Sequence, residues 1–211
     1  AIDENKHTLQ TKASELIGSG KFADAEKQLI TNAKRLERRN PQEAAWSRER
    51  LDLLELLKDK KSGPSNDKDE EVLLSHQARL DEARQMYEKD KAKINESYLA
   101  RCLAIHGLLL LDKDPVRGQD LIKQALKIDN LGVIDSMLEY TNDMRVVAAL
   151  SNPNEVPIER IGKILKRLDT IYSSLQECGY DKQLKEKDPV RYYNYVGAKT
   201  WTYAALEKNE K

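Results

Sequence analysis

Glycine and proline are scarce in this chain of 211 residues, which contains nine glycines and six prolines. Sandwiches and barrels of short strands need many tight turns, and these two residues usually supply them. Their scarcity argues against such folds. We therefore expect a protein built almost entirely from helices.

Cysteine and histidine are also rare. The two cysteines, Cys102 and Cys178, lie far apart and form neither a CxxC pair nor a Cys/His metal spacing. The three histidines make no HExxH motif. There is no G-x-S-x-G motif, and Gly18-Ser19-Gly20 follows a helical pattern and lacks the lysine of a phosphate-binding loop. The sequence predicts no metal, no cofactor and no catalytic constellation, and so a protein that is not an enzyme.

An excess of one charge is missing as well. Lysine plus arginine and aspartate plus glutamate number 36 each, with 20 of each sign in residues 1–105 and 16 of each in residues 106–211. Binding to nucleic acid needs a surplus of cations over phosphate, so we expect no nucleic-acid partner. The longest apolar run, Leu108 to Leu111, is far below the roughly 20 residues of a membrane span. The sequence begins at Ala1 and not at a methionine, which fits either removal of a signal peptide or a trimmed chain, so both a cytoplasmic and an exported protein stay open.

Apolar residues at helical spacing dominate what remains. Hydrophobic residues make up 39% of the chain and charged residues 34%, enough apolar surface for one core. The spacing and the turn residues predict about nine helices in a single domain, 1–211, with one candidate for a flexible linker at Ser62 to Asn66. The expected helices cover residues 9–17, 22–36, 41–60, 70–94, 98–111, 115–128, 133–150, 158–175 and 188–208.

Two of these helices carry the most informative pattern. Residues 98–111 are apolar nearly all round, so this helix should be the most buried element. The large positions of this helix are Cys102, Ile105 and Leu109. The next helix has a small, a large and a small residue at Gly118, Ile122 and Ala125. In this pattern the segment Tyr98 to Asn130 resembles a tetratricopeptide repeat, although His106 stands where that family has a small residue. Residues 6–37 look similar, and Tyr193, Val196 and Gly197 resemble the opening helix of a further repeat.

The resemblance implies an all-α, tetratricopeptide-like right-handed α-α superhelix with a concave surface that binds a peptide or a partner helix. The exposed first-helix positions of that family correspond here to a set of candidate partner-binding residues. These are Leu103, Leu110, Arg191, Asn194 and Trp201, with Ala100 and Gly107 beside the first two. An adaptor or assembly scaffold for a protein or peptide is the function that this interpretation predicts.

Several alternatives stay open. The apolar candidates around Leu103 can simply be covered by flanking helices, and a pocket near Leu103, His106 and Leu110 would suit a sensor of a small apolar ligand. A third hypothesis is an enzyme whose active site is assembled from dispersed carboxylates.

The pentapeptide KDPVR occurs at 113–117 and again at 187–191. It marks either a long repeat or two separate helix starts capped by aspartate and proline. The aromatic residues of 188–208 either dock a partner or close the core.

Overall fold

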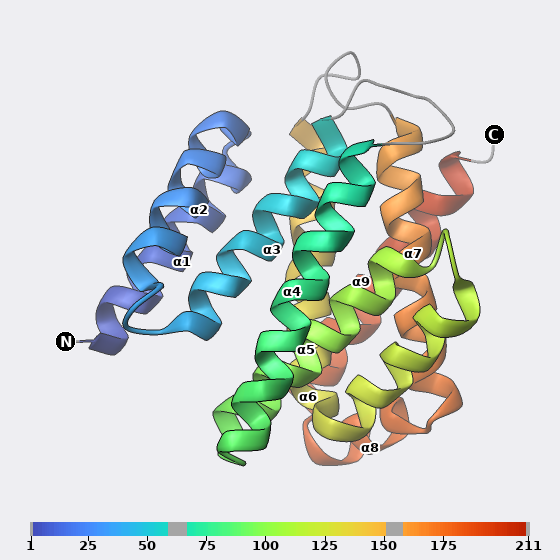
Figure 1. Cartoon of the computed structure of the whole chain (residues 1–211). Helices are drawn as coiled ribbons and strands as arrows, with labels where there is room; N and C mark the ends of the chain where they lie inside the picture. The colour runs from blue at the N-terminus through green and yellow to red at the C-terminus, as the bar shows by residue number, and fades with distance from the viewer. Residues whose placement is uncertain (1, 59–66, 151–157, 210–211) are drawn as a thin grey trace.

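The computed structural model describes residues 2–58, 67–150 and 158–209, and every regular element in these ranges is a helix (Figure 1). The expected linker, Ser62 to Asn66, lies outside the described residues. The helices are α1 (Ile2–Gly18), α2 (Phe22–Leu36), α3 (Pro41–Lys58), α4 (Asp67–Lys89), α5 (Lys93–Leu110), α6 (Pro115–Leu150), α7 (Ile158–Glu177), α8 (Tyr180–Lys187) and α9 (Pro189–Asn209). The predicted all-α class is thereby confirmed.

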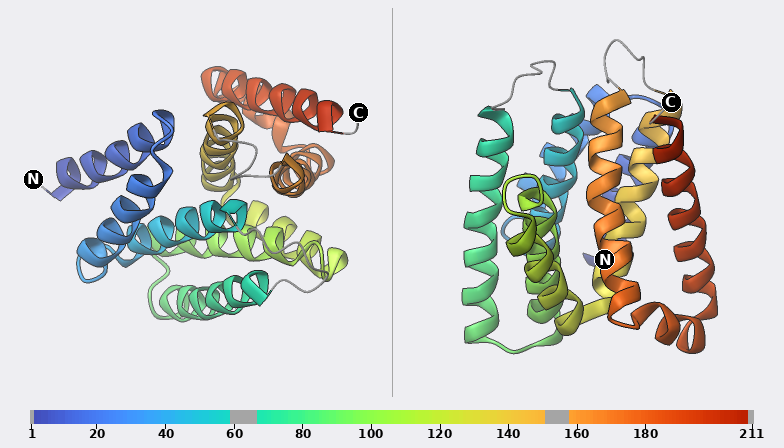
Figure 2. Two further views of the ribbon diagram at one scale, coloured as in Figure 1. Left: turned by 90° about the horizontal axis from the view of Figure 1, so that it is seen from above. Right: turned by 90° about the vertical axis from the view of Figure 1, so that its right-hand side faces the viewer.

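Helices pack mainly on their neighbours along the chain (Figure 2). The hairpin of α1 and α2 lies on one side, α4 and α5 pack together, and α7 and α9 lie on the other side beside the second half of α6. Two further contacts close the array, because α1 and α9 both also pack on α6. As a result, α6 is the element that joins the two sides.

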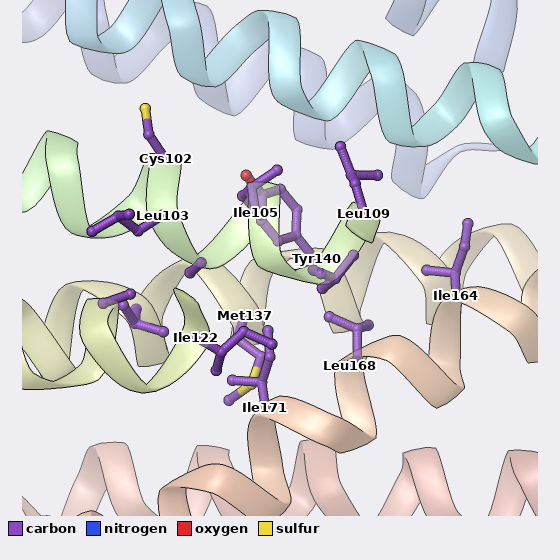
Figure 3. Close-up of a cluster of buried hydrophobic side chains, with 14 of the residues drawn as sticks. Cys102, Leu103, Ile105, Leu109, Ile122, Met137, Tyr140, Ile164, Leu168 and Ile171 are labelled. Atoms are coloured by element: carbon purple, nitrogen blue, oxygen red, sulfur yellow. The ribbon is translucent and has the colours of Figure 1, made fainter. Parts of the chain in front are cut away.

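Helix α5 forms the centre of the core, as its composition predicts. From Tyr98 to Leu110 every side chain except that of Arg101 is buried. Leucine and isoleucine side chains of α5 meet those of α6 and α7, whereas Cys102 points the other way, toward α3 (Figure 3). Helix α5 therefore packs against several helices at once, and its apolar residues lie on all its faces instead of forming one stripe.

Two glycines allow a close approach between α5 and α6. A Cβ added at Gly107 would lie 2.6 Å from the carbonyl oxygen of Gly118, and one added at Gly118 would lie 2.7 Å from that of Gly107. Only residues without a side chain allow two backbones to come this near. The sequence pattern identified Gly118, and for Gly107 it left open an exposed position or coverage by flanking helices; the structure shows Gly107 covered.

Two expected boundaries also differ from the structure. Helix α4 ends at Lys89, not near Ile94, and α5 begins at Lys93, so Asn95 lies inside a helix and is not a cap. The side chain of Asp90 forms the turn between them: its Oδ1 accepts a hydrogen bond from the Ala92 N–H at 3.0 Å. Asn95 Nδ2 then donates to the Asp90 carbonyl oxygen at 3.0 Å. The polar residues of this turn are present in the sequence, but apolar residues continue at helical spacing across it, so the predicted helix extends too far.

Helix α6 combines two expected helices across a kink at Asp129, where φ is −151° and ψ is 83°. Asp129 Oδ1 accepts a hydrogen bond from the Gly132 N–H at 3.2 Å, as an N-cap aspartate does. Helix α8 was not expected, since Tyr180–Lys187 carries only one buried apolar residue, Leu184. It follows Gly179, which ends α7 with a φ of 75°.

The two KDPVR segments have the same local role. Asp114 and Asp188 each accept a hydrogen bond at 3.1 Å from the backbone N–H three residues later, and a proline follows each as the first helical residue. This is the expected arrangement of an aspartate N-cap before a proline. It accounts for both copies as helix starts.

The crossing of α5 and α6 predicts that Gly107→Ala lowers the free energy of unfolding by about 1 to 3 kcal/mol, because the new methyl group meets backbone that cannot rotate away. Gly197→Ala is the matched control. Nothing lies within 4 Å of its Cβ position, and alanine favours a helix over glycine by up to about 1 kcal/mol. Chemical denaturation measures both; equal effects would contradict the crossing.

Candidate functional site

A groove runs between the second half of α6 and α9, at the edge of the molecule. Its volume is about 460 Å³, within the range of ligand pockets. Two helices line it, each with residues spaced three or four apart along one face. The lining residues are Leu138, Glu139, Thr141, Asn142, Arg145, Tyr193, Asn194, Gly197, Ala198 and Trp201.

The two walls run in the same direction. At the foot of the groove, Arg191 in the first turn of α9 donates to Asp135 in the second half of α6, with Nε and Oδ1 2.8 Å apart. From that ion pair both helices continue upward toward the C-terminal end of the chain (Figure 1). Residues about 56 positions apart therefore lie at similar heights, which places Asn194 near Glu139 and Trp201 near Arg145.

Small residues create the space between these walls. Gly197 has nothing within 4 Å of its Cβ position, and its neighbour Ala198 contributes only a methyl group. A larger side chain at Gly197 would point into open space. The groove is therefore a property of residue size on α9 and is open without any rearrangement of the helices.

A buried arginine lies behind the α6 wall. The side chain of Arg50, on α3, is fully buried and donates to both oxygens of Asp143 from Nε and Nη2, each at 3.1 Å. Its Nη1 lies 3.3 Å from Glu139 Oε1. Gln10 and Ser14 of α1 accept further hydrogen bonds from the same guanidinium at 3.3 Å. These five residues, the Arg50 network, tie α1, α3 and α6 together.

Glu139 links this network to the groove, since its side chain is one-quarter exposed and lines the cavity while contacting Arg50. Burial raises the pKa of Glu139 from 4.5 to about 7; Arg50 opposes the rise, and the nearby carboxylate of Asp143 adds to it. Arg50 carries one positive charge and contacts two carboxylates, of which Asp143 accepts two hydrogen bonds and Glu139 makes one contact. The network therefore holds one negative charge more than its cation balances when Glu139 is ionised.

A second buried cluster lies further from the groove. Glu49 on α3 accepts hydrogen bonds from the Tyr140 hydroxyl at 3.1 Å and from Cys102 Sγ at 3.8 Å. Burial raises the pKa of Glu49, against the attraction of Arg101 and Arg79. The guanidinium groups of Arg50 and Arg101 both lie over the Trp46 ring, 5.7 Å and 4.9 Å from its centroid. Every polar contact of Glu49 is internal, so this cluster supports the fold.

The aromatic residues of α9 divide between core and surface. Tyr195 is buried and its ring packs on that of Tyr172 with 5.7 Å between centroids, so part of α9 closes the core. Tyr193 is 79% exposed. Trp201 is partly buried against the core and also lines the groove. Some aromatic residues of α9 therefore close the core, and others are exposed, as a docking surface would require.

The predicted partner-binding residues do not lie on one surface. Leu103 and Leu110 are 3% and 8% exposed and belong to the core, as the alternative of coverage by flanking helices describes, and Ala100 and Gly107 are buried as well. Asn194 and Trp201 line the groove. Arg191 lies at its foot, held by Asp135 and by Asp188 at 2.9 Å, and lines a second cavity beside α8.

Sequence reasoning missed the α6 wall of the groove. A helix over residues 133–150 was expected, but Glu139, Asn142 and Arg145 were not among the candidate residues. One signal was present: Asp143 lies on the inward face between Tyr140 and Met144, as Arg50 does in the stripe of α3. Charged residues at inward positions need a partner, and these two partner each other.

No group of three or more His, Cys, Asp or Glu side chains is placed to hold a metal ion within the described ranges. Both cysteines are free, and none of the described helices is long and apolar enough to cross a bilayer. Comparison with known proteins gives no match to any protein-family model, curated protein or solved structure.

The Arg50 network predicts that Arg50→Met lowers the free energy of unfolding by about 3 to 5 kcal/mol, because Asp143 is left as a buried charge without a cation. The double variant Arg50→Met with Asp143→Leu should recover most of this loss, since it removes both charges. Urea denaturation of the two variants and the wild type tests this. A double variant no more stable than the single one would show that the pair is not the cause.

The raised pKa of Glu139 predicts that stability falls as the pH increases from about 5 to 7.5. The folded state holds a proton on Glu139 in this window and the unfolded state releases it, so each step toward higher pH favours unfolding, by a total on the order of 2 kcal/mol. Glu139→Gln should remove this part of the slope. Denaturation across the pH range measures it, and parallel curves for the two proteins would refute it.

Proposed function

We propose that this chain is a non-enzymatic protein-interaction module, an adaptor or scaffold that binds a short segment of a partner protein in the groove between α6 and α9. The observation that carries this proposal is the groove itself, which is open, lies along two parallel helices and is lined by both aromatic and polar side chains.

The groove has the chemistry of a peptide site. The amide side chains of Asn142 and Asn194 each offer a donor and an acceptor, which is what a peptide group requires. Tyr193 and Trp201 provide flat apolar surface together with a polar group, and such aromatic residues are favoured at protein interfaces. Small-ligand pockets are mostly enclosed and apolar, whereas this cavity lies along an exposed helix. A peptide is therefore the better match.

We further propose that the helices form a tetratricopeptide-like array. Packing between sequence neighbours and the glycine crossing of α5 and α6 support this interpretation. The right-handed superhelix of that family stays a prediction. Helix α9 presents an exposed face that includes Tyr193. Leu103, His106 and Leu110 are core residues, so the proposal places binding at α9 and not at the alternative sensor pocket.

A substitution at Gly197 tests the site without weakening the fold. Gly197→Leu should fill the groove and abolish binding to peptides that the wild type selects from a random peptide array, while Gly197→Ala keeps it. Both variants should melt at or above the wild-type temperature, because glycine is replaced by a better helix former in open space. Undiminished binding by a folded Gly197→Leu protein would rule out this groove.

A further inference from the structure

The two charged residues of the groove lie toward opposite ends of it. Glu139 and Arg145 are six residues apart on α6, which corresponds to roughly 9 Å along the helix axis. Glu139 lies at the height of Asn194, and Arg145 at that of Trp201. The groove therefore has an acidic end near its foot and a basic end above it.

The acidic end lacks a full counter-charge. Arg50 donates two hydrogen bonds to Asp143 and only one contact, at 3.3 Å, to Glu139. The Glu139 side chain is one-quarter exposed and is among the residues that line the groove. A cation entering from the groove would balance the negative charge that Arg50 leaves over.

The basic end is open to solvent. Arg145 is exposed, and none of the hydrogen bonds or ion pairs among the described residues involves its guanidinium. An arginine of this kind can receive a carboxylate through two parallel hydrogen bonds. Glu139 and Arg145 therefore line the same cavity without forming an ion pair with each other.

From this arrangement we infer the chemistry of the occupant, an inference that rests on the function proposed above: the groove binds a protein segment that presents a basic side chain to Glu139 and an acidic side chain to Arg145. The separation of roughly 9 Å fits two residues that lie about two to four positions apart in an extended segment, since each residue spans about 3.3 Å and both side chains are flexible.

The cation at Glu139 gives binding a pH dependence. The charged groups that face Glu139 are Arg50 and Glu43 from α3, Arg101 from α5 and Asp143 from α6. Their combined effect with burial leaves the pKa of Glu139 at about 7, so the carboxylate is mostly protonated at pH 6 and mostly ionised at pH 8. Affinity for a basic side chain should rise by up to roughly tenfold over this interval.

The test uses an array of acetylated and amidated hexapeptides of randomised sequence, probed with the full chain. We expect the bound peptides to be enriched in a lysine or arginine together with an aspartate or glutamate two to four positions away. Glu139→Gln should lose the preference for the basic residue and the pH dependence. Arg145→Gln should lose only the preference for the acidic residue. The control variants Glu186→Gln and Lys182→Gln remove the same charges from exposed positions on α8 and should change neither.

Each outcome has a separate meaning. Peptides that bind without a charge preference, or with the same preference in Glu139→Gln and Arg145→Gln as in the wild type, overturn the inference and leave the peptide-binding function intact. No binding beyond that of the blocked variant Gly197→Leu overturns the proposed function and the inference with it. Binding of free lysine or glutamate, seen by thermal shift in the absence of peptide binding, overturns both in favour of a small ligand.

Discussion

The guanidinium of Arg50 has no contact with solvent, yet it donates hydrogen bonds to side chains of two helices that are distant in the sequence, α1 and α6. Its contacts with Asp143, Gln10 and Ser14 fix where α1 and the second half of α6 lie relative to α3. A buried cation is stable only when its hydrogen-bonding groups are satisfied, so this position tolerates little displacement of its neighbours. The α6 wall of the groove is set by this constraint, because Glu139 and Asp143 lie one turn apart on that helix.

The chain has equal numbers of acidic and basic residues, and some of them are buried as pairs. A neutral protein with many charged residues must distribute them, and here several are placed inside, where they pair: Arg50 with Asp143, and Arg101 near Glu49. Such pairs contribute modestly to stability compared with an apolar core of the same volume, but they penalise wrong packing strongly, since a lost partner leaves an uncompensated charge. They therefore favour one arrangement of the helices over others of similar apolar burial.

The sequence predicts the helices well and the surface between them poorly. Apolar spacing places most helices and identifies α5 as the buried centre, because burial in this helix involves all its faces. It misplaces the α4–α5 boundary, since the hydrogen bonds of Asp90 that end α4 interrupt a pattern whose apolar residues continue. It leaves open whether Gly107 is exposed or covered, because a glycine at a helix crossing and one on an exposed face look alike without the partner helix. For the candidate site, sequence reasoning identified Asn194 and Trp201 on α9, while Glu139 and Arg145 depend on which helix lies opposite.

The groove and the packing of α9 arise from the same choice of residue sizes. Tyr195 anchors one face of α9 against Tyr172 of α7, and Arg191 fixes its start against Asp135 of α6. Beyond these two attachments, Gly197 and Ala198 have too little side chain to fill the space toward α6, so the groove stays open there. A leucine at Gly197 would extend the apolar contact and turn the groove into an ordinary helix interface. Glycine costs the helix up to about 1 kcal/mol relative to alanine, and no close contact at Gly197 requires the absence of a side chain. The space that it leaves is what an occupant of the groove would use.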